Sequence, residues 1–529
     1  MSRKRLILAA ILLAAFAINL DTTIVNVALP TLVRQLHASN SQLQWVVDAY
    51  NLVFAALLLA CGSISDRVGR KGMLLAGLLV FGAASAVGGT LSTPGQLIAD
   101  RCVMGLGAAM VFPATLSLIS NVFTERSERA RAIGLWGATA GVAIALGPIV
   151  GGWLLERFDW TSIFFAMAPV AALAAGLVAA YVPTSRDASA PRADLPGFAG
   201  STAAMALLIY TIIEAPDHGW SSARTLGGFA GAAALLAAFI VWELRAREPM
   251  LDVSLFRNPR FTAASGSVTV AFFSLFGFIF LITQYFQFIK HYGPLSAGVH
   301  LLPVASSVGV ASVLGTKLAV RFGTKVVVAS GLTLVTAFYA WVATASATTH
   351  YATLAAQMVV YGVGMGFTSA PATEAIMGVV PRAKAGVGSA VNDATRLLGG
   401  TLGVAVIGSV YASLYGSRLS ALLPAHTPAR LARAAHTSVG AALTLAQHAS
   451  ASGAHALGAA ITGAATSAFI RGLSVGCLVA GGVAAAGAIA AALLLPAHPS
   501  SADSAEGAGQ CDAASVARPA PALAQPPAA

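Results

Sequence analysis

Long apolar stretches, separated by short polar segments, run along almost the whole chain. A transmembrane helix needs about 20 predominantly apolar residues. Stretches of that length predict six helices at 6–28, 45–64, 73–91, 97–120, 131–155 and 160–182, two at 195–214 and 225–244, and six at 261–286, 297–319, 326–347, 352–376, 386–412 and 468–495. The pattern therefore predicts an all-α polytopic membrane protein with fourteen transmembrane helices, arranged as six, two and six.

Basic residues concentrate in every second loop of this arrangement. With the N-terminus placed in the cytoplasm, twenty of the 31 Lys and Arg residues fall in inside segments and seven in outside loops. Inside loops of membrane proteins carry this excess of positive charge. The distribution predicts that both termini are cytoplasmic. It also explains the net charge of +11 without a nucleic-acid partner, because the basic clusters form no stripe with interleaved aromatic residues.

An internal repeat divides the chain. Arg67-Val68-Gly69-Arg70-Lys71 recurs as Arg321-Phe322-Gly323-Thr324-Lys325, an offset of 254 residues. Repeats of this kind are a recurring architecture of secondary transporters. They predict an N-terminal six-helix half at 1–183, inserted helices 7 and 8 with flanking loops at 184–260, and a C-terminal half at 261–495. The long outer loop at 413–467 and the tail at 496–529, rich in Ala, Ser, Pro and His, are expected to be mobile.

Charged residues inside the predicted spans are the first candidates for function. Each costs about 2.5–3.5 kcal/mol or more at mid-membrane, so it needs a partner or a role. Asp21 and Arg101 fall at similar depth, and protonation of Asp21 would release Arg101 from a pair between them. Asp48 lies near the outer end of the second span. A proton-coupling role and a merely interfacial position are both open for Asp48.

The second half carries three further charges that bear on function. Asp393 and Arg396 are three residues apart on one predicted helix, so they can pair on one face, and a structural ion pair is the favoured interpretation. Glu374 has no basic residue nearby in the sequence and could attract a cationic substrate. Residues Leu275 and Ala355 occupy the positions offset from Asp21 and Arg101, which predicts that proton chemistry is confined to the first half.

Two segments of the first half combine closely spaced glycines with charged residues or proline. The short turn Gly62–Lys71 resembles the signature loop of the major facilitator superfamily, and the segment Gly147–Gly152 resembles the motif of its antiporters. The resemblance implies that the following residues control conformation: Gly62, Asp66, Arg67, Gly69, Arg70, Gly147, Pro148, Gly151 and Gly152.

Further matches narrow the resemblance. Leu20–Pro30 is similar to the first-helix hallmark of the fourteen-helix drug:proton antiporter family, and Trp45–Tyr50 resembles its quaternary-ammonium and multidrug-resistance branch. The resemblance spans about residues 5 to 412. It implies a major facilitator fold and proton-coupled efflux of small amphipathic or cationic compounds across the bacterial inner membrane by alternating access. Asn26, inside the first motif, joins Glu374 and Asp393 as a candidate for substrate binding.

The same features restrict cofactors and partners. No Gly-x-x-x-x-Gly-Lys-Ser/Thr loop is present and the four cysteines have no paired spacing, so ATP coupling, a metal site and a disulfide framework are not predicted. The expected partners are protons, a small-molecule substrate and the lipid bilayer, with the chain as a monomer driven by the proton gradient. The alternatives are a proton-driven importer on the same fold and a membrane-embedded receptor or enzyme.

Overall fold

The computed structural model describes residues 3–186, 194–246, 253–380, 385–424, 427 and 429–496. Within these ranges the chain is helical, with no strand. Thirteen of the described helices are long and apolar enough to cross a membrane. The predicted tail at 496–529 lies outside the described residues apart from its first residue. The prediction of an all-α polytopic membrane protein is confirmed.

The helices follow the predicted order. The first six are α1 (Arg3–Leu36), α2 (Asn40–Val68), α3 (Arg70–Gly88), α4 (Pro94–Val122), α5 (Arg126–Arg157) and α6 (Ser162–Tyr181). The next two are α7 (Leu195–His218) and α8 (Ala223–Arg245). The remainder are η1 (Val253–Arg257), α9 (Pro259–Gln284), η2 (Tyr285–Ile289), α10 (Pro294–Val299), α11 (Leu302–Phe322), α12 (Thr324–Val342), α13 (Tyr351–Val379), α14 (Ala385–Leu422), α15 (Ala429–Thr437), α16 (Val439–Ala451) and α17 (His455–Leu494).

The helix expected at 352–376 corresponds to α13, which is not among the thirteen apolar spans. Its 29 residues are long enough to cross a membrane, but Gln357, Thr368 and several glycines reduce its hydropathy. Gln357 and Thr368 are buried, and α13 packs against α9, α11 and α12. Because neighbouring helices cover it, α13 needs less apolar surface than a lipid-facing helix. The fold is compatible with fourteen spans.

Local sequence explains several helix starts. Ser39 and Gln42 form a capping box at the start of α2, in which each side chain accepts a hydrogen bond from the other residue's backbone N–H. Thr93 caps α4 and is followed by Pro94, a residue favoured in a first helical turn. These signals place the helix ends to within a few residues of the apolar stretches.

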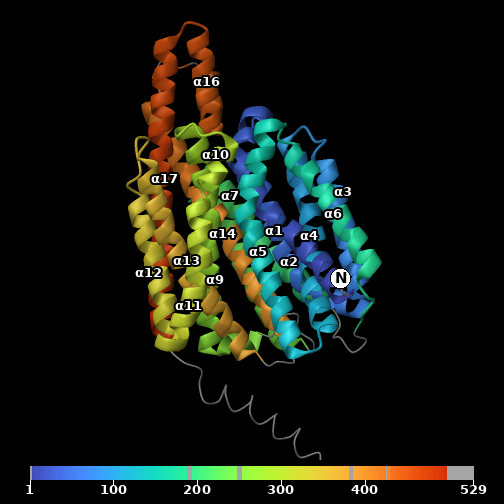
Figure 1. The fold of residues 1–529 in the computed structure, drawn as a ribbon. Helices are drawn as coiled ribbons and strands as arrows, with labels where there is room; N and C mark the ends of the chain where they lie inside the picture. The colour runs from blue at the N-terminus through green and yellow to red at the C-terminus, as the bar shows by residue number, and fades with distance from the viewer. Residues whose placement is uncertain are drawn as a thin grey trace, which may run out of the picture.

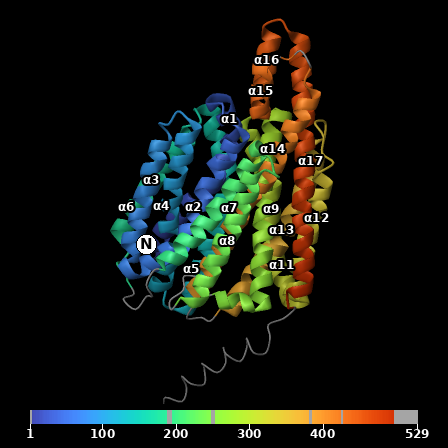
Figure 2. The ribbon, with the colours of Figure 1, turned by 180° about the vertical axis from the view of Figure 1, so that it is seen from behind.

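The two halves share one packing pattern. In the first half, α4 packs on α2 and α3, α1 packs on α5, and α3 packs on α6. The second half repeats these contacts in the same order: α13 packs on α11 and α12, α9 packs on α14, and α12 packs on α17. Helix α7 lies across the seam between the halves, against α2 and α14, and α8 packs on α7 (Figure 2).

Both described chain ends lie at one end of the bundle (Figures 1 and 2). We call this the terminal end, because α1 starts there and α17 finishes there. At the opposite end, α15, α16 and the start of α17 project beyond the other helices as a helical hairpin (Figure 1). We call that the hairpin end.

The described residues of 413–467 differ from the expected mobile loop. Helix α14 continues to Leu422, α17 begins at His455, and α15 and α16 fill most of the interval. Alanine and leucine have high helix propensity, and α16 packs along α17. The hydroxyl of Tyr415 on α14 also donates to the carbonyl of Ala435 on α15 at 3.0 Å. Composition alone suggested a loop, whereas helix packing orders the segment.

Candidate functional site: a buried ion pair and the closed end of the bundle

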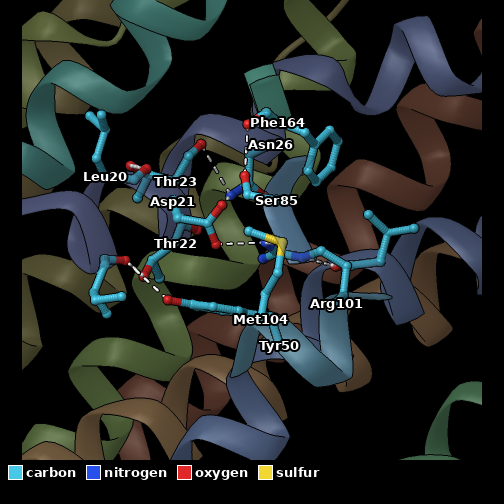
Figure 3. Close-up of polar contacts among 12 residues, drawn as sticks. Leu20, Asp21, Thr22, Thr23, Asn26, Tyr50, Ser85, Arg101, Met104 and Phe164 are labelled. Carbon is cyan, nitrogen blue, oxygen red and sulfur yellow. Dashed lines mark hydrogen bonds and ion pairs between the residues drawn. The ribbon is translucent and has the colours of Figure 1, made fainter. Parts of the chain in front are cut away.

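Asp21 of α1 and Arg101 of α4 form an ion pair inside the first half (Figure 3). Nη1 of Arg101 donates to Oδ2 of Asp21 at 2.6 Å, and each side chain is 1% exposed. Nε of Arg101 donates to the carbonyl of Val46 on α2 at 3.0 Å, and the guanidinium carbon lies 4.2 Å from the ring centroid of Tyr50. Buried charges need such partners because they have lost their hydration. The two charges that the sequence placed at similar depth are in direct contact.

Hydrogen bonds on α1 surround this pair. The hydroxyls of Tyr50 and Thr22 both donate to the carbonyl of Ile18, at 3.1 and 3.0 Å. The amide nitrogen of Asn26 donates to the carbonyl of Thr22 at 3.3 Å, and its Oδ1 atom has no hydrogen-bond partner among the described residues. Asn26 therefore lies beside the ion pair on α1, one helical turn from Thr22 (Figure 3).

Asp48 of α2 is fully buried, with 0% of its surface exposed. Neither of its carboxylate oxygens has a hydrogen-bond partner in the described part of the chain. The interfacial, solvated position considered for Asp48 is therefore wrong. Helix α2, which carries Asp48, packs against α4, α7 and α14. A buried carboxyl group without a partner is costly to ionise, so Asp48 stays a candidate for proton chemistry.

The candidate residues of the second half lie at a different level of the bundle. Asp393 is 10% exposed at its side chain, and its Oδ1 atom lies 3.6 Å from Nη1 of Arg396, so the predicted pair is present. The guanidinium of Arg396 also lies 4.4 Å from the ring centroid of Phe272. Glu374 is exposed near the end of α13. Both carboxylates lie toward the terminal end, apart from Asn26, so the three substrate candidates do not form one cluster.

An ion pair joins the last turn of α2 to the start of α3 at the terminal end. Nε of Arg70 donates to Oδ1 of Asp66 at 2.6 Å, whereas Arg67 is exposed. Gly69 has a φ of 132°, which favours glycine, and Gly323 in the repeated motif has a φ of 88°. The repeat therefore preserves the turn geometry. A Cβ atom on Gly62 would lie 3.4 Å from Pro113 of α4, an ordinary contact.

The segment Gly147–Gly152 packs α5 against both halves. A Cβ atom on Gly147 or Gly151 would lie within 3.0 Å of atoms of α1. On Gly152 it would lie 2.5 Å from Cα of Leu295 on α10, and the carbonyl of Pro148 lies against Gly298. Glycine is required wherever helix backbones approach this closely. This motif brings α1, α5 and α10 together at the hairpin end.

Polar contacts between the halves occur at the same end. Nε2 of Gln287 donates to the carbonyl of Val27 on α1 at 2.8 Å. The hydroxyl of Ser409 donates to Oε1 of Gln44 at 3.2 Å, and Oε1 of Glu156 accepts from the backbone N–H of Leu295 at 3.2 Å. These bonds and the tight glycines close the hairpin end.

Toward the terminal end, α5 is less tightly covered. A Cβ atom on Gly134, Gly137 or Gly141 would meet no atom within 4 Å. The described contacts therefore hold the two halves together mainly at the hairpin end. Within the described residues, no group of three His, Cys, Asp or Glu side chains could hold a metal ion.

Sequence reasoning missed two kinds of polar residue. Asp100 precedes Arg101, is 7% exposed, and has an Oδ2 atom without a hydrogen-bond partner among the described residues. A second charge beside Arg101 in an apolar stretch was a visible signal. Gln44 and Gln287 connect the halves, but an uncharged glutamine in a span gives no sequence signal of which neighbour it contacts.

Comparisons with known proteins agree along most of the chain. The family model of the Major Facilitator Superfamily matches residues 11–404. Multidrug resistance protein Stp of Mycobacterium tuberculosis is 35% identical over 427 residues, covering 80% of this chain and 79% of that protein. Multidrug efflux pump LfrA of Mycolicibacterium smegmatis is 33% identical over 445 residues, covering 84% and 88%. The methylenomycin A resistance protein of Streptomyces coelicolor is 34% identical over 392 residues, covering 74% and 82%.

Solved structures show the same fold at low sequence identity. A bacterial homologue of the human lysosomal transporter Spinster, in an inward-facing and unoccupied conformation, has a TM-score of 0.67 at 16% identity and covers 94% of this chain and 99% of that chain. The peptide transporter POT in complex with sulfate has a TM-score of 0.59 at 13% identity, covering 92% and 95%. Together, the match over residues 11–404, these relatives and this fold show that the chain belongs to the Major Facilitator Superfamily and is a multi-pass membrane transporter rather than an enzyme.

Proposed function

We propose that this protein exports small amphipathic or cationic compounds, including drugs, in exchange for protons. The relatives named for multidrug resistance and efflux support the export of drugs. The observation that supports the proton step is the ion pair between Asp21 and Arg101, in which both side chains are 1% exposed. A titratable carboxylate in a bilayer is a functional candidate because its burial is expensive.

The proposed proton step acts on the contact between α1 and α4. Protonation of Asp21 removes its negative charge and most of its attraction for Arg101. Arg101 keeps its hydrogen bond to Val46 and its position over the ring of Tyr50. The arginine therefore stays with α2 and α4, while α1 becomes free to move. The energy comes from the proton gradient and needs no cofactor, with the membrane potential supplying about 2.3 kcal/mol per charge per 100 mV.

Substrate enters from the terminal end in this proposal. The halves are held together at the hairpin end, which corresponds to an inward-facing state if the terminal end is cytoplasmic. Glu374 and Asp393 lie toward the terminal end, where their negative charges attract cations. Asn26 has a free acceptor oxygen deeper in the bundle. We assign the first contact with substrate to the carboxylates and the deeper contact to Asn26.

The proposed orientation in the membrane follows from the distribution of basic residues. The excess of basic residues in alternate loops supports cytoplasmic termini and a hairpin on the outer side of the bacterial inner membrane. The described packing forms a complete two-half bundle, and we propose that a monomer is the transporting unit.

Transport in proteoliposomes tests the function. Purified protein is reconstituted with an internal pH indicator and a fluorescent monovalent cationic drug, and a pH gradient is imposed in either direction. We expect drug movement against the proton flow, accompanied by a pH change that collapses with a protonophore. Drug movement in the same direction as the protons would indicate an importer, and movement that ignores the gradient would contradict proton coupling.

A further inference from the structure

A short π-helical segment, η2, follows α9 at the hairpin end and carries Gln287. The backbone N–H of Lys290 donates to the carbonyl of Tyr285 at 3.0 Å, the i to i+5 spacing of a π-helix. Single π-helical turns occur frequently at functional sites because the extra residue rotates the side chains that follow it. Here the rotated segment faces α1 of the other half.

Gln287 uses this position to reach across the seam. It is 4% exposed, and its Nε2 atom donates to the carbonyl of Val27 at 2.8 Å, whereas its Oε1 atom has no hydrogen-bond partner among the described residues. The bond joins a side chain of the second half to the backbone of the first. It must break whenever the hairpin end opens.

Gln284, one turn earlier, shows that the cross-seam bond is not the default for a buried glutamine. It is 0% exposed, and its Nε2 atom donates to the carbonyl of Phe280 on its own helix at 3.1 Å. Its Oε1 atom also lacks a hydrogen-bond partner in the described chain. The two glutamines share residue type, burial and one unpaired oxygen, and differ in which half accepts the bond. Gln284 is therefore a matched control.

The acceptor lies on the helix that carries the ion pair. Val27 is six residues beyond Asp21 on α1, and the hairpin holds the same helix further along, where Gly440 of α16 packs against Val33 and Phe288. Movement of α1 at Asp21 and separation of Val27 from Gln287 are linked because one helix carries both groups.

We propose that the hydrogen bond between Gln287 and Val27 is a latch that holds the hairpin end closed, and that Gln287 is a positioning residue for the transport cycle. The latch is part of the alternating-access mechanism proposed above. It couples the closed end to the position of α1. Because a membrane-buried hydrogen bond contributes modestly, its loss shifts the ratio of open to closed protein by roughly three- to tenfold.

The first experiment measures closure directly, without substrate or a proton gradient. Spin labels at Gln35 of α1 and Thr348 of the second half, both exposed, report the separation of the halves at the hairpin end in lipid nanodiscs. The four native cysteines are replaced in the parent protein, so the spin labels attach only at these two positions. Gln287→Leu should raise the long-distance population by roughly three- to tenfold, whereas Gln284→Leu should leave the distribution as in the parent.

The second experiment uses a variant whose hydrogen bond depends on pH. In Gln287→Glu the neutral carboxyl group can donate to the Val27 carbonyl, but the ionised group can only accept. The closed fraction should therefore fall as pH rises through the titration of the introduced carboxyl group. Gln287→Leu should show the same raised open fraction at every pH, so a loss of the hydrogen bond without a titratable group would not reproduce the pH dependence.

The surroundings determine the control for this titration. Arg34 and His291 line a cavity of about 150 Å³ with Gln287, and α16 contributes Thr444 and Gln447 to it. The ring of His300 lies 6.1 Å from that of Phe286, tilted by 60°. Asp21 is the nearby acid of α1. Because the parent protein retains Arg34, His291, His300 and Asp21, its own distribution over the same pH range gives the background to subtract.

The outcomes separate the latch from the proposed function. Parent-like distance distributions for Gln287→Leu, or a Gln287→Glu variant whose closed fraction does not change with pH, would overturn the latch. Opening in Gln284→Leu equal to that in Gln287→Leu would also overturn it. Failure of proton-coupled export in the parent protein would instead contradict the proposed function, because closure is measured without transport.

Discussion

At the residue scale, function depends on which partners stabilise a few charged groups that are buried inside an apolar bundle. Asp21 and Arg101 form an ion pair, with 2.6 Å between Oδ2 and Nη1. Arg101 also contacts the Val46 carbonyl and the Tyr50 ring, both on α2. Asp48 is equally buried but has no hydrogen-bond partner among the described residues. The paired carboxylate is better suited to a switch, because protonation changes a specific contact between two helices.

Neutralising Asp21 tests this assignment. Asp21→Asn keeps the shape of the side chain but cannot titrate, so we expect loss of proton-coupled efflux to the level of empty liposomes, with protein still in the membrane. Substrate binding, measured by fluorescence titration, should largely survive. Arg101→Ala should shift the pH optimum of transport upward, because the positive charge that favours the ionised carboxylate is gone. Normal coupled efflux by Asp21→Asn would transfer the role to Asp48 or Glu374.

At the element scale, glycines decide which helices can approach each other. On α5, Gly152 packs its backbone against α10 of the other half, whereas Gly137, four turns earlier on the same helix, has open space around it. The two glycines have different environments although both lie on α5. The first belongs to the closed end and the second does not.

Alanine at these two positions should separate their roles. In Gly152→Ala the added Cβ atom would lie 2.5 Å from Cα of Leu295 and from the Pro294 carbonyl, so the hairpin end must open. In Gly137→Ala the same atom meets nothing within 4 Å, and alanine favours helix by about 0.5–1 kcal/mol. A cysteine replacing the buried Ala28 should react with an impermeant thiol reagent several-fold faster only in Gly152→Ala. Equal labelling rates would refute this role of Gly152.

At the scale of the whole molecule, two six-helix halves repeat one packing pattern. Their described polar contacts and tight glycines lie at the hairpin end. Helix α7 lies across the seam against α2 and α14, and α8 packs on α7, so the contact between α1, α5 and α10 is made by the two halves themselves. The helical hairpin gives the molecule a visible polarity, with the described chain ends on the opposite side (Figures 1 and 2).

Thiol labelling in intact cells and in inverted vesicles tests the proposed orientation. Single cysteines replace Arg245, at the last residue of α8, and Gln447, on α16, both of which are exposed. An impermeant reagent should label position 447 only from outside and position 245 only from inside. The parent without cysteine measures background labelling. Labelling of position 245 in intact cells would contradict the proposed orientation and favour the opposite one.

Local sequence determined the number and order of the spans, the repeat, and the presence of Asp21 and Arg101 at matching depth. These properties follow from the sequence because a helix in a bilayer must satisfy its own backbone and be apolar over a fixed length. Even α13, which is not among the thirteen apolar spans, was predicted from its stretch of apolar residues at 352–376.

Only the tertiary structure decided which groups meet. Nothing local distinguishes Gln287, which crosses to Val27, from Gln284, which bonds to its own helix. The burial of Asp48, the helical order of 413–467 and the closed hairpin end likewise depend on helices distant in the sequence. The physical reason is that a side chain's partner in a packed bundle is determined by helix rotation and approach, which arise from many contacts at once.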